Sequence, residues 1–249
     1  MSAIWEKDRY QADILTLTNK TIIEYDMKSA NTSLAREFKL LPEDKISEIE
    51  ALGKQSRVVA IGKLMRDDKE FANKLKASFM EARRLFFEEN ELEDDEVITI
   101  KRDAIFVTRY VEHMEIGEHI LFRPKNQYTS FIHLKPFEIY YSSDGLDIKG
   151  MDDEIYKRYH KDYFGDFLSG VIRRLETSSK KETLRYIRSV FDSYKWLELD
   201  PGYYREFSNT SQFRYLDGKV SMEEYMQDLT QLDISNNFKL INQLLMTIL

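Results

Sequence analysis

The sequence predicts an α+β protein with a mixed or antiparallel sheet, a helical insertion and a helical C-terminal third. Two short apolar runs, in residues 21–34 and 97–108, are typical of buried strands. Between them, apolar residues recur at three- and four-residue steps, which is the mark of a helix with one buried face: Phe71, Leu75, Phe79, Ala82 and Phe86. After Gly150 the pattern becomes helical and rich in tyrosine and phenylalanine.

The N-terminal part is expected to hold one strand at residues 14–17 and a second at residues 22–25. Residues 28–33 are polar and indicate a turn, and residues 34–41 indicate a helix that Pro42 ends. Pro42 also starts the next helix, because a proline in the first turn loses no hydrogen bond there. Residues 54–90 form a charged helical stretch, and the acidic residues 88–96 form a loop leading to the next strand.

Residues 97–107 indicate a hairpin, with one arm at 97–100, the other at 104–107, and Lys101-Arg102-Asp103 at its apex. Three further strands are expected at 120–122, 128–134 and 137–141. Residues 123–126 and 135–136 would separate them, and Asp144-Gly145 supplies a turn.

The C-terminal third is predicted to be a set of helices. The first covers residues 153–175, and the second runs to about residue 197 behind Ser179 and Glu182, which form a capping box. Turns are expected at 200–202 and 217–218, a helix start at Ser221, and a last amphipathic helix at 236–249. The expected domains are therefore residues 1–150, with a helical insertion at about 43–92, and residues 151–249.

Composition limits the class of protein. The chain has 249 residues, 42% of them hydrophobic and 33% charged, and this is enough for one large domain or two small ones. It has no cysteine, which excludes disulfides and cysteine-bound metals and suits a reducing, cytoplasmic interior. The N-terminus has no apolar segment typical of a secretory signal, and no run is as long as a membrane span, so no membrane partner is expected.

Two aspartates occupy the ends of predicted strands: Asp26 ends the first buried strand and Asp103 lies at the hairpin apex. Two carboxylates on neighbouring strands can bind Mg²⁺ or Mn²⁺, because Mg²⁺ needs only one or two carboxylates beside water and substrate phosphates. A pair of such ions can activate a 3′-hydroxyl and stabilise departing pyrophosphate. The competing interpretation is that both acids simply end strands, where aspartate is common.

The residues around Asp26 resemble a known motif. Asp-Met-Lys-Ser-Ala-Asn-Thr-Ser-Leu, which begins at Asp26, resembles the first catalytic motif of palm-domain polymerases. That motif often reads Asp-Ile-Lys-Ser-Phe-Phe-Pro-Ser-Ile in bacterial reverse transcriptases and Asp-x-x-Ser-Leu-Tyr-Pro-Ser in family B DNA polymerases. Asp26, Lys28, Ser29 and Ser33 match one or both patterns.

Two later segments extend this resemblance over residues 20–155. Residues 100–107 resemble the hairpin that carries the second metal-binding aspartate of these families, with Asp103 in its place. Residues 139–141 and 147–152 resemble the family B segment whose lysine-tyrosine and Lys-Gly elements contact the primer. The resemblance implies a palm-like sheet, fingers in the insertion and a thumb-like C-terminal third.

The resemblance also implies the functional residues. Asp26 and Asp103 would be catalytic and would ligate Mg²⁺ or Mn²⁺. Nucleotide and primer contacts would come from Lys28, Ser29, Asn31, Arg102 and Lys149. Nucleic acid, a nucleoside triphosphate and a protein partner are the expected partners, and a virus or mobile element is the expected source of so reduced a chain.

Several departures keep other functions open. Asn31 stands where these families place an aromatic residue that screens the sugar 2′-hydroxyl, and the hairpin has a single acid between Arg102 and Ala104. No match exists to the helix that grips the triphosphate; Lys54, Arg57 and Lys63 are the candidates. The net charge of −7 also disfavours nucleic-acid binding unless the basic residues gather on one face. The alternatives are an inactive palm-derived protein that binds nucleic acid or a replication or transcription partner, and an unrelated α+β interaction domain.

Overall fold

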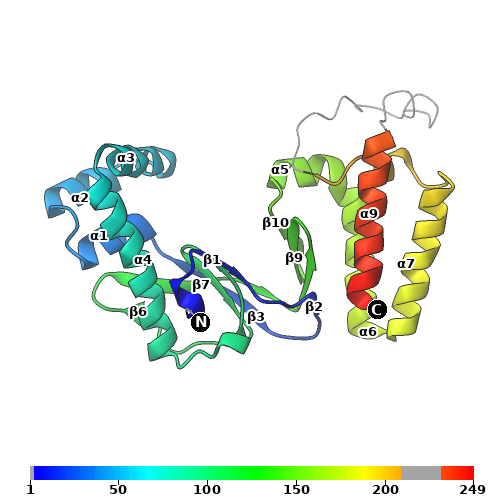
Figure 1. The fold of residues 1–249 in the computed structure, drawn as a ribbon, viewed down its shortest axis with the longest axis horizontal. Coiled ribbons are helices and arrows are strands. Elements are labelled where there is room, and N and C mark those ends of the chain that lie inside the picture. Colours follow the sequence, from blue (N-terminus) through cyan, green and yellow to red (C-terminus); the bar gives the residue numbers. More distant parts are fainter. Residues whose placement is uncertain (1–2, 209–230) are drawn as a thin grey trace. The chain divides into compact units, whose positions relative to one another are not determined.

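The computed structural model describes residues 3–208 and 231–249. The chain combines helices with two antiparallel sheets, which confirms the expected α+β class (Figure 1). It divides into two compact units. Unit 1 contains Met1–Asp13 and Thr21–Gln127, and unit 2 contains Ile14–Lys20 and Tyr128–Leu249. Residue 150, the boundary expected from the sequence, lies in unit 2 between the last strand and the helices that follow it.

Unit 1 is built on a sheet with the strand order β1-β4-β5-β3-β7-β6. Antiparallel pairings join β1 to β4, β4 to β5, β5 to β3 and β6 to β7. The hairpin β4–β5 and the adjacent strand β3 confirm the strands expected around Asp26 and Asp103. The strands are β1 (Arg9–Gln11), β3 (Ile22–Met27), β4 (Val97–Lys101), β5 (Ala104–Val107), β6 (Glu115–Ile116) and β7 (Ile120–Tyr128).

The helices of unit 1 cover one face of this sheet. Side chains alternate along a strand, so Ile23, Tyr25 and Met27 of β3 point to the same face and join the core there. The helical stripe recognised in the sequence, from Leu75 to Phe86, packs in the same core. The helices are η1 (Ile4–Glu6), α1 (Ala30–Glu37), α2 (Glu43–Glu50), α3 (Lys54–Asp67), α4 (Lys69–Glu89) and η2 (Asp94–Glu96).

Two helical expectations for unit 1 need correction. Helix α1 begins at Ala30, inside the segment expected as a turn, because Ser29 alone takes the left-handed conformation before the helix. The helical stretch 54–90 is two helices. Asp68 has an extended backbone and its side chain accepts a hydrogen bond from the amide of Phe71 at 2.9 Å, so it caps a new helix.

Strand β7 is longer than the strand expected at residues 120–122. It runs through residues 123–126, which were expected to separate strands. Strand β6 pairs only with Ile120 and Leu121 of β7, so it has ended before Pro124. The proline is tolerated because no residue of β6 lies opposite it to accept a hydrogen bond from its missing amide hydrogen. As a result, Arg123 and Lys125 are exposed residues of the sheet that carries Asp26.

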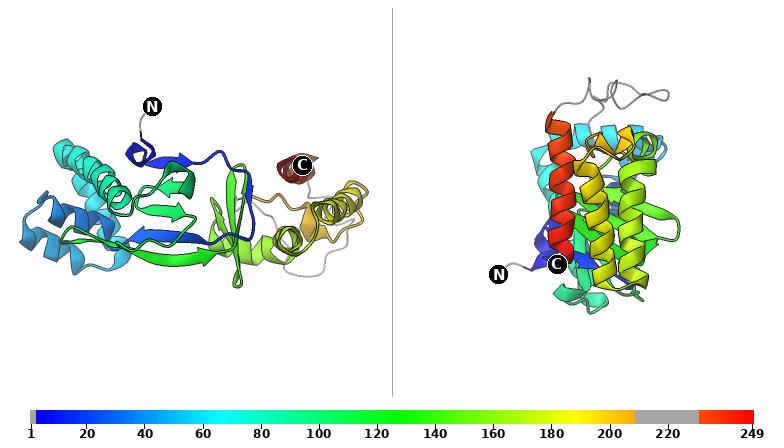
Figure 2. Two further views of the ribbon diagram at one scale, coloured as in Figure 1. Left: turned by 90° about the horizontal axis from the view of Figure 1, so that it is seen from below. Right: turned by 90° about the vertical axis from the view of Figure 1, so that its right-hand side faces the viewer.

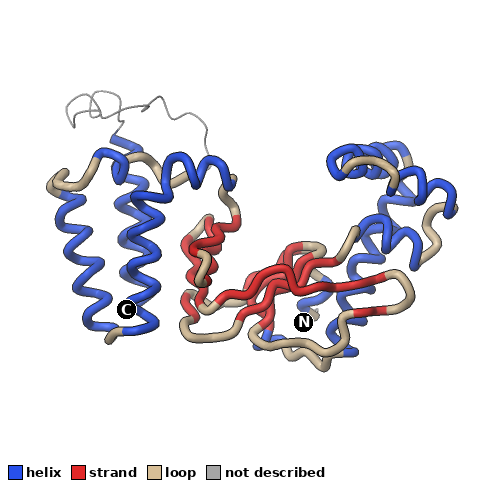
Figure 3. Tube along the Cα trace, turned by 180° about the vertical axis from the view of Figure 1, so that it is seen from behind, coloured by secondary structure: helices blue, strands red, loops and turns tan. Residues whose placement is uncertain are grey.

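Unit 2 has a sheet with the order β10-β9-β8-β2 and a group of helices (Figure 3). The strands are β2 (Thr16–Leu17), β8 (Ser130–Leu134), β9 (Phe137–Ser142) and β10 (Gly145–Lys149). Helices α6, α7 and α9 lie side by side (Figure 2), with α7 in contact with both of the others. The helices are α5 (Asp153–Ile155), η3 (Tyr156–Gly165), α6 (Asp166–Thr177), α7 (Lys180–Lys195), η4 (Pro201–Tyr204) and α9 (Gln231–Ile248).

The capping box of α7 is confirmed: the hydroxyl of Ser179 accepts from the amide of Glu182, whose carboxylate accepts from the amide of Ser179. The last helix is described from Gln231 to Ile248 and so includes five residues before the expected start. The expected turn at 217–218 and the helix start at Ser221 lie outside the described residues. None of the described helices is both long and apolar enough to cross a membrane.

Candidate active site

Strand pairing brings Asp26 and Asp103 together. Asp26 lies near the end of β3 and pairs with Ala104, the first residue of β5, so Asp103 is the next residue along. The carbonyl of Asp103 accepts a hydrogen bond from the amide of Met27 at 2.9 Å. Both aspartates are partly exposed. Two acids 77 positions apart in the sequence are therefore neighbours at one end of the sheet.

The electrostatics of Asp26 reflect this arrangement. Burial raises the pKa of the Asp26 carboxyl, and the charges of Asp103 and Glu24 raise it further, while Lys125 and Arg123 lower it. The carboxylate of Asp26 is thus destabilised by its surroundings and by its acidic neighbours. A divalent cation placed between Asp26 and Asp103 would relieve this repulsion.

The cations that act on Asp26 come from β7, and sequence reasoning missed them. Lys125 Nζ lies 3.2 Å from a carboxylate oxygen of the buried Glu24, whose other oxygen accepts from Asn126 Nδ2 at 2.7 Å. Arg123 is exposed and lies two residues earlier, on the same side of the strand. Buried Phe122 next to exposed Arg123 and Lys125 is a pattern that could have indicated a strand. The proline at position 124 argues against a strand there, so this part of β7 was not predicted.

Arg102, expected near phosphates, has a different neighbour. Its guanidinium carbon lies 4.5 Å from the ring centre of Phe79 on α4, and its backbone φ is 55°. Among the described residues, neither Asp26 nor Asp103 forms a salt bridge with Arg102 or Lys101. Both carboxylates are thus partly exposed and are not paired with the cations that precede Asp103 in the described part of the chain.

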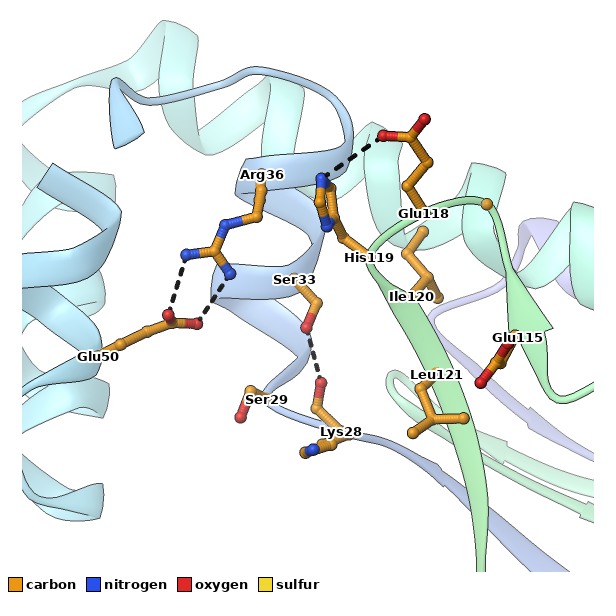
Figure 4. A pocket seen from close by; sticks show the side chains of 11 residues that line it. Lys28, Ser29, Ser33, Arg36, Glu50, Glu115, Glu118, His119, Ile120 and Leu121 are labelled. Carbon is orange, nitrogen blue, oxygen red and sulfur yellow. Dashed lines mark hydrogen bonds and ion pairs between the residues drawn. The ribbon is translucent and has the colours of Figure 1, made fainter. Parts of the chain in front are cut away.

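A pocket of about 390 Å³ is lined by residues that follow Asp26 in the sequence, the first of them Lys28 (Figure 4). The predicted residues Lys28 and Ser29 line it, and both are exposed. The hydroxyl of Ser33 donates to the carbonyl of Lys28 at 2.8 Å, and the amide of Lys28 donates to the carbonyl of Leu121 at 2.9 Å. The rest of the lining is Arg36, Glu50, Glu115, Gly117, Glu118, His119, Ile120 and Leu121.

The pocket wall at the β6–β7 turn is tied to α1 by Glu37. Its carboxylate accepts from the amides of Glu118 and His119 at 3.0 and 2.7 Å. Gly117 has a φ of 75°, and a Cβ there would lie 2.3 Å from a carboxylate oxygen of Glu37, so this turn needs glycine. On the opposite side, Arg36 pairs with Glu43 and Glu50 at 2.7 and 2.9 Å, which raises the pKa of its guanidinium.

Two further predicted residues have distinct surroundings. Asn31 is half-buried in α1, and its side-chain oxygen is buried without a hydrogen-bond partner in the described part of the chain. Lys149 belongs to unit 2, where its ammonium lies 2.8 Å from Asp147, which also accepts a hydrogen bond from the hydroxyl of Tyr128. His113 and His119, whose spacing in the sequence fits neither a helix face nor an ordinary zinc motif, are both exposed.

The donor set decides which metal chemistry the site could support. Over residues 3–208 and 231–249 no group of three or more histidine, cysteine, aspartate or glutamate side chains is arranged to hold an ion. Asp26 and Asp103 supply two carboxylates, which is sufficient for Mg²⁺ when a substrate adds phosphate oxygens. The two carboxylates alone would leave most of the coordination shell of such an ion to water or to a ligand.

Comparison with known proteins gives one result for the whole chain. No curated protein matches it. A family model described as the bacteriophage PBS1 gene 130 protein matches residues 1–249. The chain therefore belongs to the bacteriophage PBS1 gene 130 protein family.

Proposed function

We propose that this chain is a small palm-type polymerase that transfers nucleotides to a primer under the direction of a template. The observation that carries the proposal is the pairing of β3 with β5, which sets Asp26 beside Asp103 at the end of the sheet. The resemblance of both segments to polymerase motifs supports it, and membership in a phage family agrees with the viral source expected for such a chain.

The residues have separate tasks in this proposal. Asp26 and Asp103 would ligate Mg²⁺ or Mn²⁺, which when bound lowers the pKa of the attacking 3′-hydroxyl and stabilises the departing pyrophosphate. The triphosphate would occupy the pocket that Lys28 and Ser29 line, and these two residues would contact its phosphates.

Other residues would act around this centre. Arg123 and Lys125 of β7 would balance the charge near Asp26, because they already lower its pKa. Asn31 would face the sugar, and Lys149 would contact the primer. Arg102 would have to leave the ring of Phe79 to reach a phosphate.

Primer extension with Mg²⁺ or Mn²⁺ tests the proposal. Wild type is compared with Asp26→Asn and Asp103→Asn, which remove a charge but keep the size of the side chain, and with the exposed Asp13→Asn as a control. We expect each site variant to lose about 100-fold or more of the rate, because a lost electrostatic contact in phosphoryl transfer has effects of that order. The control should match wild type. Equal rates in all four proteins would contradict the proposal.

The second candidate is an inactive palm-derived protein that binds nucleic acid or a replication or transcription partner. The single acid at the hairpin favours it, because Arg102 and Ala104 flank Asp103 where a second carboxylate could strengthen metal binding. Tight binding of a primer–template, unaltered in Asp26→Asn and without any extension by wild type, would support this alternative.

A further inference from the structure

Arg83 on α4 is a fully buried cation in unit 1. Burial lowers the pKa of its guanidinium, and the neighbouring carboxylate of Asp8 opposes this effect. A buried charge is costly unless hydrogen bonds replace its water, so a buried guanidinium needs acceptors beside its nitrogens. Each of the three nitrogens of this guanidinium does have an acceptor.

Those acceptors are on or beside the turn that carries Asp103. Arg83 Nη1 donates to the carbonyl of Arg102 at 2.8 Å, Nη2 to Asp8 Oδ1 at 3.2 Å, and Nε to the carbonyl of Trp5 at 2.8 Å. The amide of Arg102 in turn donates to the carbonyl of Asp8 at 2.8 Å. Both backbone polar groups of Arg102 are therefore held, one by α4 and the other by the segment before β1.

The hydrogen bonds continue from Arg102 to the strand that carries Asp26. Asp103 follows Arg102, and its carbonyl accepts from the amide of Met27, the residue after Asp26. Arg102 also has a positive φ of 55°, which is unfavourable for a residue other than glycine and needs support from its surroundings. Phe79, one helical turn before Arg83, supplies more support through its contact with the Arg102 guanidinium.

We infer that Arg83 is a positioning residue that holds the β4–β5 turn and so keeps Asp103 beside Asp26. The part of this inference that concerns metal binding rests on the proposed function, but the restraint on the turn does not. Arg83 would not touch a metal or substrate, because it is buried and its nitrogens are bonded within unit 1.

Two measurements on Arg83→Lys test the inference. Lysine keeps the charge but cannot reach three acceptors in the same planar arrangement. Arg84→Lys is the matched control, because Arg84 is the next residue of α4 and pairs only with Glu81 and Glu88 on the same helix among the described residues. Amide hydrogen exchange of Met27 and Arg102 reports the order of the turn, and Mn²⁺ affinity, measured by electron paramagnetic resonance, reports the two carboxylates.

In Arg83→Lys we expect exchange at both amides to become about 10-fold faster or more, while amides of the β8–β9 pairing in unit 2 keep their rates. Mn²⁺ affinity should fall by about 10-fold, an effect typical of losing a residue that supports metal ligands. Arg84→Lys should change neither quantity. If Arg83→Lys does not fold, Asp8→Ala provides a milder loosening, because Asp8 is partly exposed and supplies one acceptor.

Unchanged exchange at Met27 in a folded variant would overturn the inference. Where wild type binds Mn²⁺ more tightly than Asp26→Asn does, faster exchange in Arg83→Lys with unaltered Mn²⁺ affinity would overturn it too, since the turn would then move without consequence for the acids. If wild type and Asp26→Asn bind Mn²⁺ equally weakly, the proposed function fails instead, and faster exchange at Met27 would still support the restraint by Arg83.

Discussion

At the scale of single residues, the ionised carboxylate of Asp26 lowers the stability of the folded protein. Burial and the charge of Asp103 raise the pKa of its carboxyl, so the folded state holds the proton more tightly than the unfolded state does. The ionised form is consequently a penalty on folding above the raised pKa, and this penalty disappears as the pH falls below the ordinary range of aspartate, near 4. A ligand that needs the charge would explain why the sequence accepts this cost.

We predict that Asp26→Asn stabilises unit 1 at neutral pH in the absence of divalent cations. The temperature of unfolding should rise by roughly 1–3 °C, because asparagine removes the partly buried charge but keeps the shape. The difference should vanish near pH 3. Added Mn²⁺ should stabilise wild type and leave the variant unaffected. A variant that is less stable than wild type at pH 7 would contradict this account.

His160 is a second buried titratable residue, in the π-helix η3 of unit 2. It is 1% exposed, and its ring lies edge-on to Phe207, with Nε2 3.3 Å from the carbonyl of Ser208. Burial lowers its pKa to about 4, and the charge of Arg205 adds to this effect. The unfolded chain therefore takes up the proton first, near pH 6.5, so stability is complete above that pH and is lost as the pH falls toward 4.

The predicted consequence is a loss of about 2 kcal/mol in the free energy of unfolding of unit 2 between pH 7.5 and pH 5. Urea unfolding at the two pH values measures it. His160→Gln should be less stable at pH 7.5 but lose much less between the two pH values. The exposed His119→Gln should keep the wild-type loss. A wild-type loss in His160→Gln would show that other groups cause the acid sensitivity.

At the scale of elements, the sequence predicted best where one local signal was sufficient. The period of the apolar residues identified β3, the β4–β5 hairpin and the buried stripe of α4, and cap chemistry identified the start of α7. It failed where tertiary pairing overrode a local signal. Pro124 is usually a strand breaker, but β7 passes through it where β6 has ended.

The candidate site follows the same division. Asp26 and Asp103 could be selected from the sequence because each lies at the end of an apolar run that predicts a strand. Their proximity follows from the antiparallel pairing of β3 with β5. The proximity of Arg123 and Lys125 to Asp26 could not be predicted, because the part of strand β7 that carries them was not. The role of Arg83 could not be predicted either, because two of its acceptors, Asp8 and Trp5, lie 75 or more positions away in the sequence. The pocket at Lys28 also needs the β6–β7 turn, whose position depends on Glu37 of α1.

The cap of α7 carries a prediction at this scale. Ser179→Ala removes the hydroxyl that accepts from the amide of Glu182 and donates to its carboxylate, and it leaves that amide only its hydrogen bond to the carbonyl of Ser179. We expect a loss of about 1 kcal/mol in the stability of unit 2, measured by urea unfolding. Ser189→Ala, in the middle of the same helix, is the control and should lose less, because its hydroxyl only bonds to the carbonyl of Tyr186 within the helix. Equal losses would mean that the cap contributes nothing specific.

At the scale of the whole molecule, the two units have separate hydrophobic cores. Phe86 and Leu75 belong to the core of unit 1, whereas Leu244 and Val171 belong to that of unit 2. Each core is made of residues from its own unit, so each can be weakened independently. Chains with two such cores commonly depart from a single all-or-none unfolding transition.

The two tryptophans make this separation measurable. Trp5 packs against the core of unit 1, and Trp196 is 68% exposed in unit 2. In a Trp196→Phe background, the fluorescence of Trp5 reports unit 1 alone, while circular dichroism reports the helices of both units. We expect Phe86→Ala to lower the urea midpoint seen by Trp5, because such a truncation costs about 3–5 kcal/mol in a packed core.

Leu244→Ala is the matched change in the other core. It should leave the Trp5 midpoint within error and lower only a second transition in circular dichroism, by about 2–5 kcal/mol. If both substitutions shift one shared transition equally, the units unfold as one cooperative body. Truncation of either core would then lower the stability of both units together.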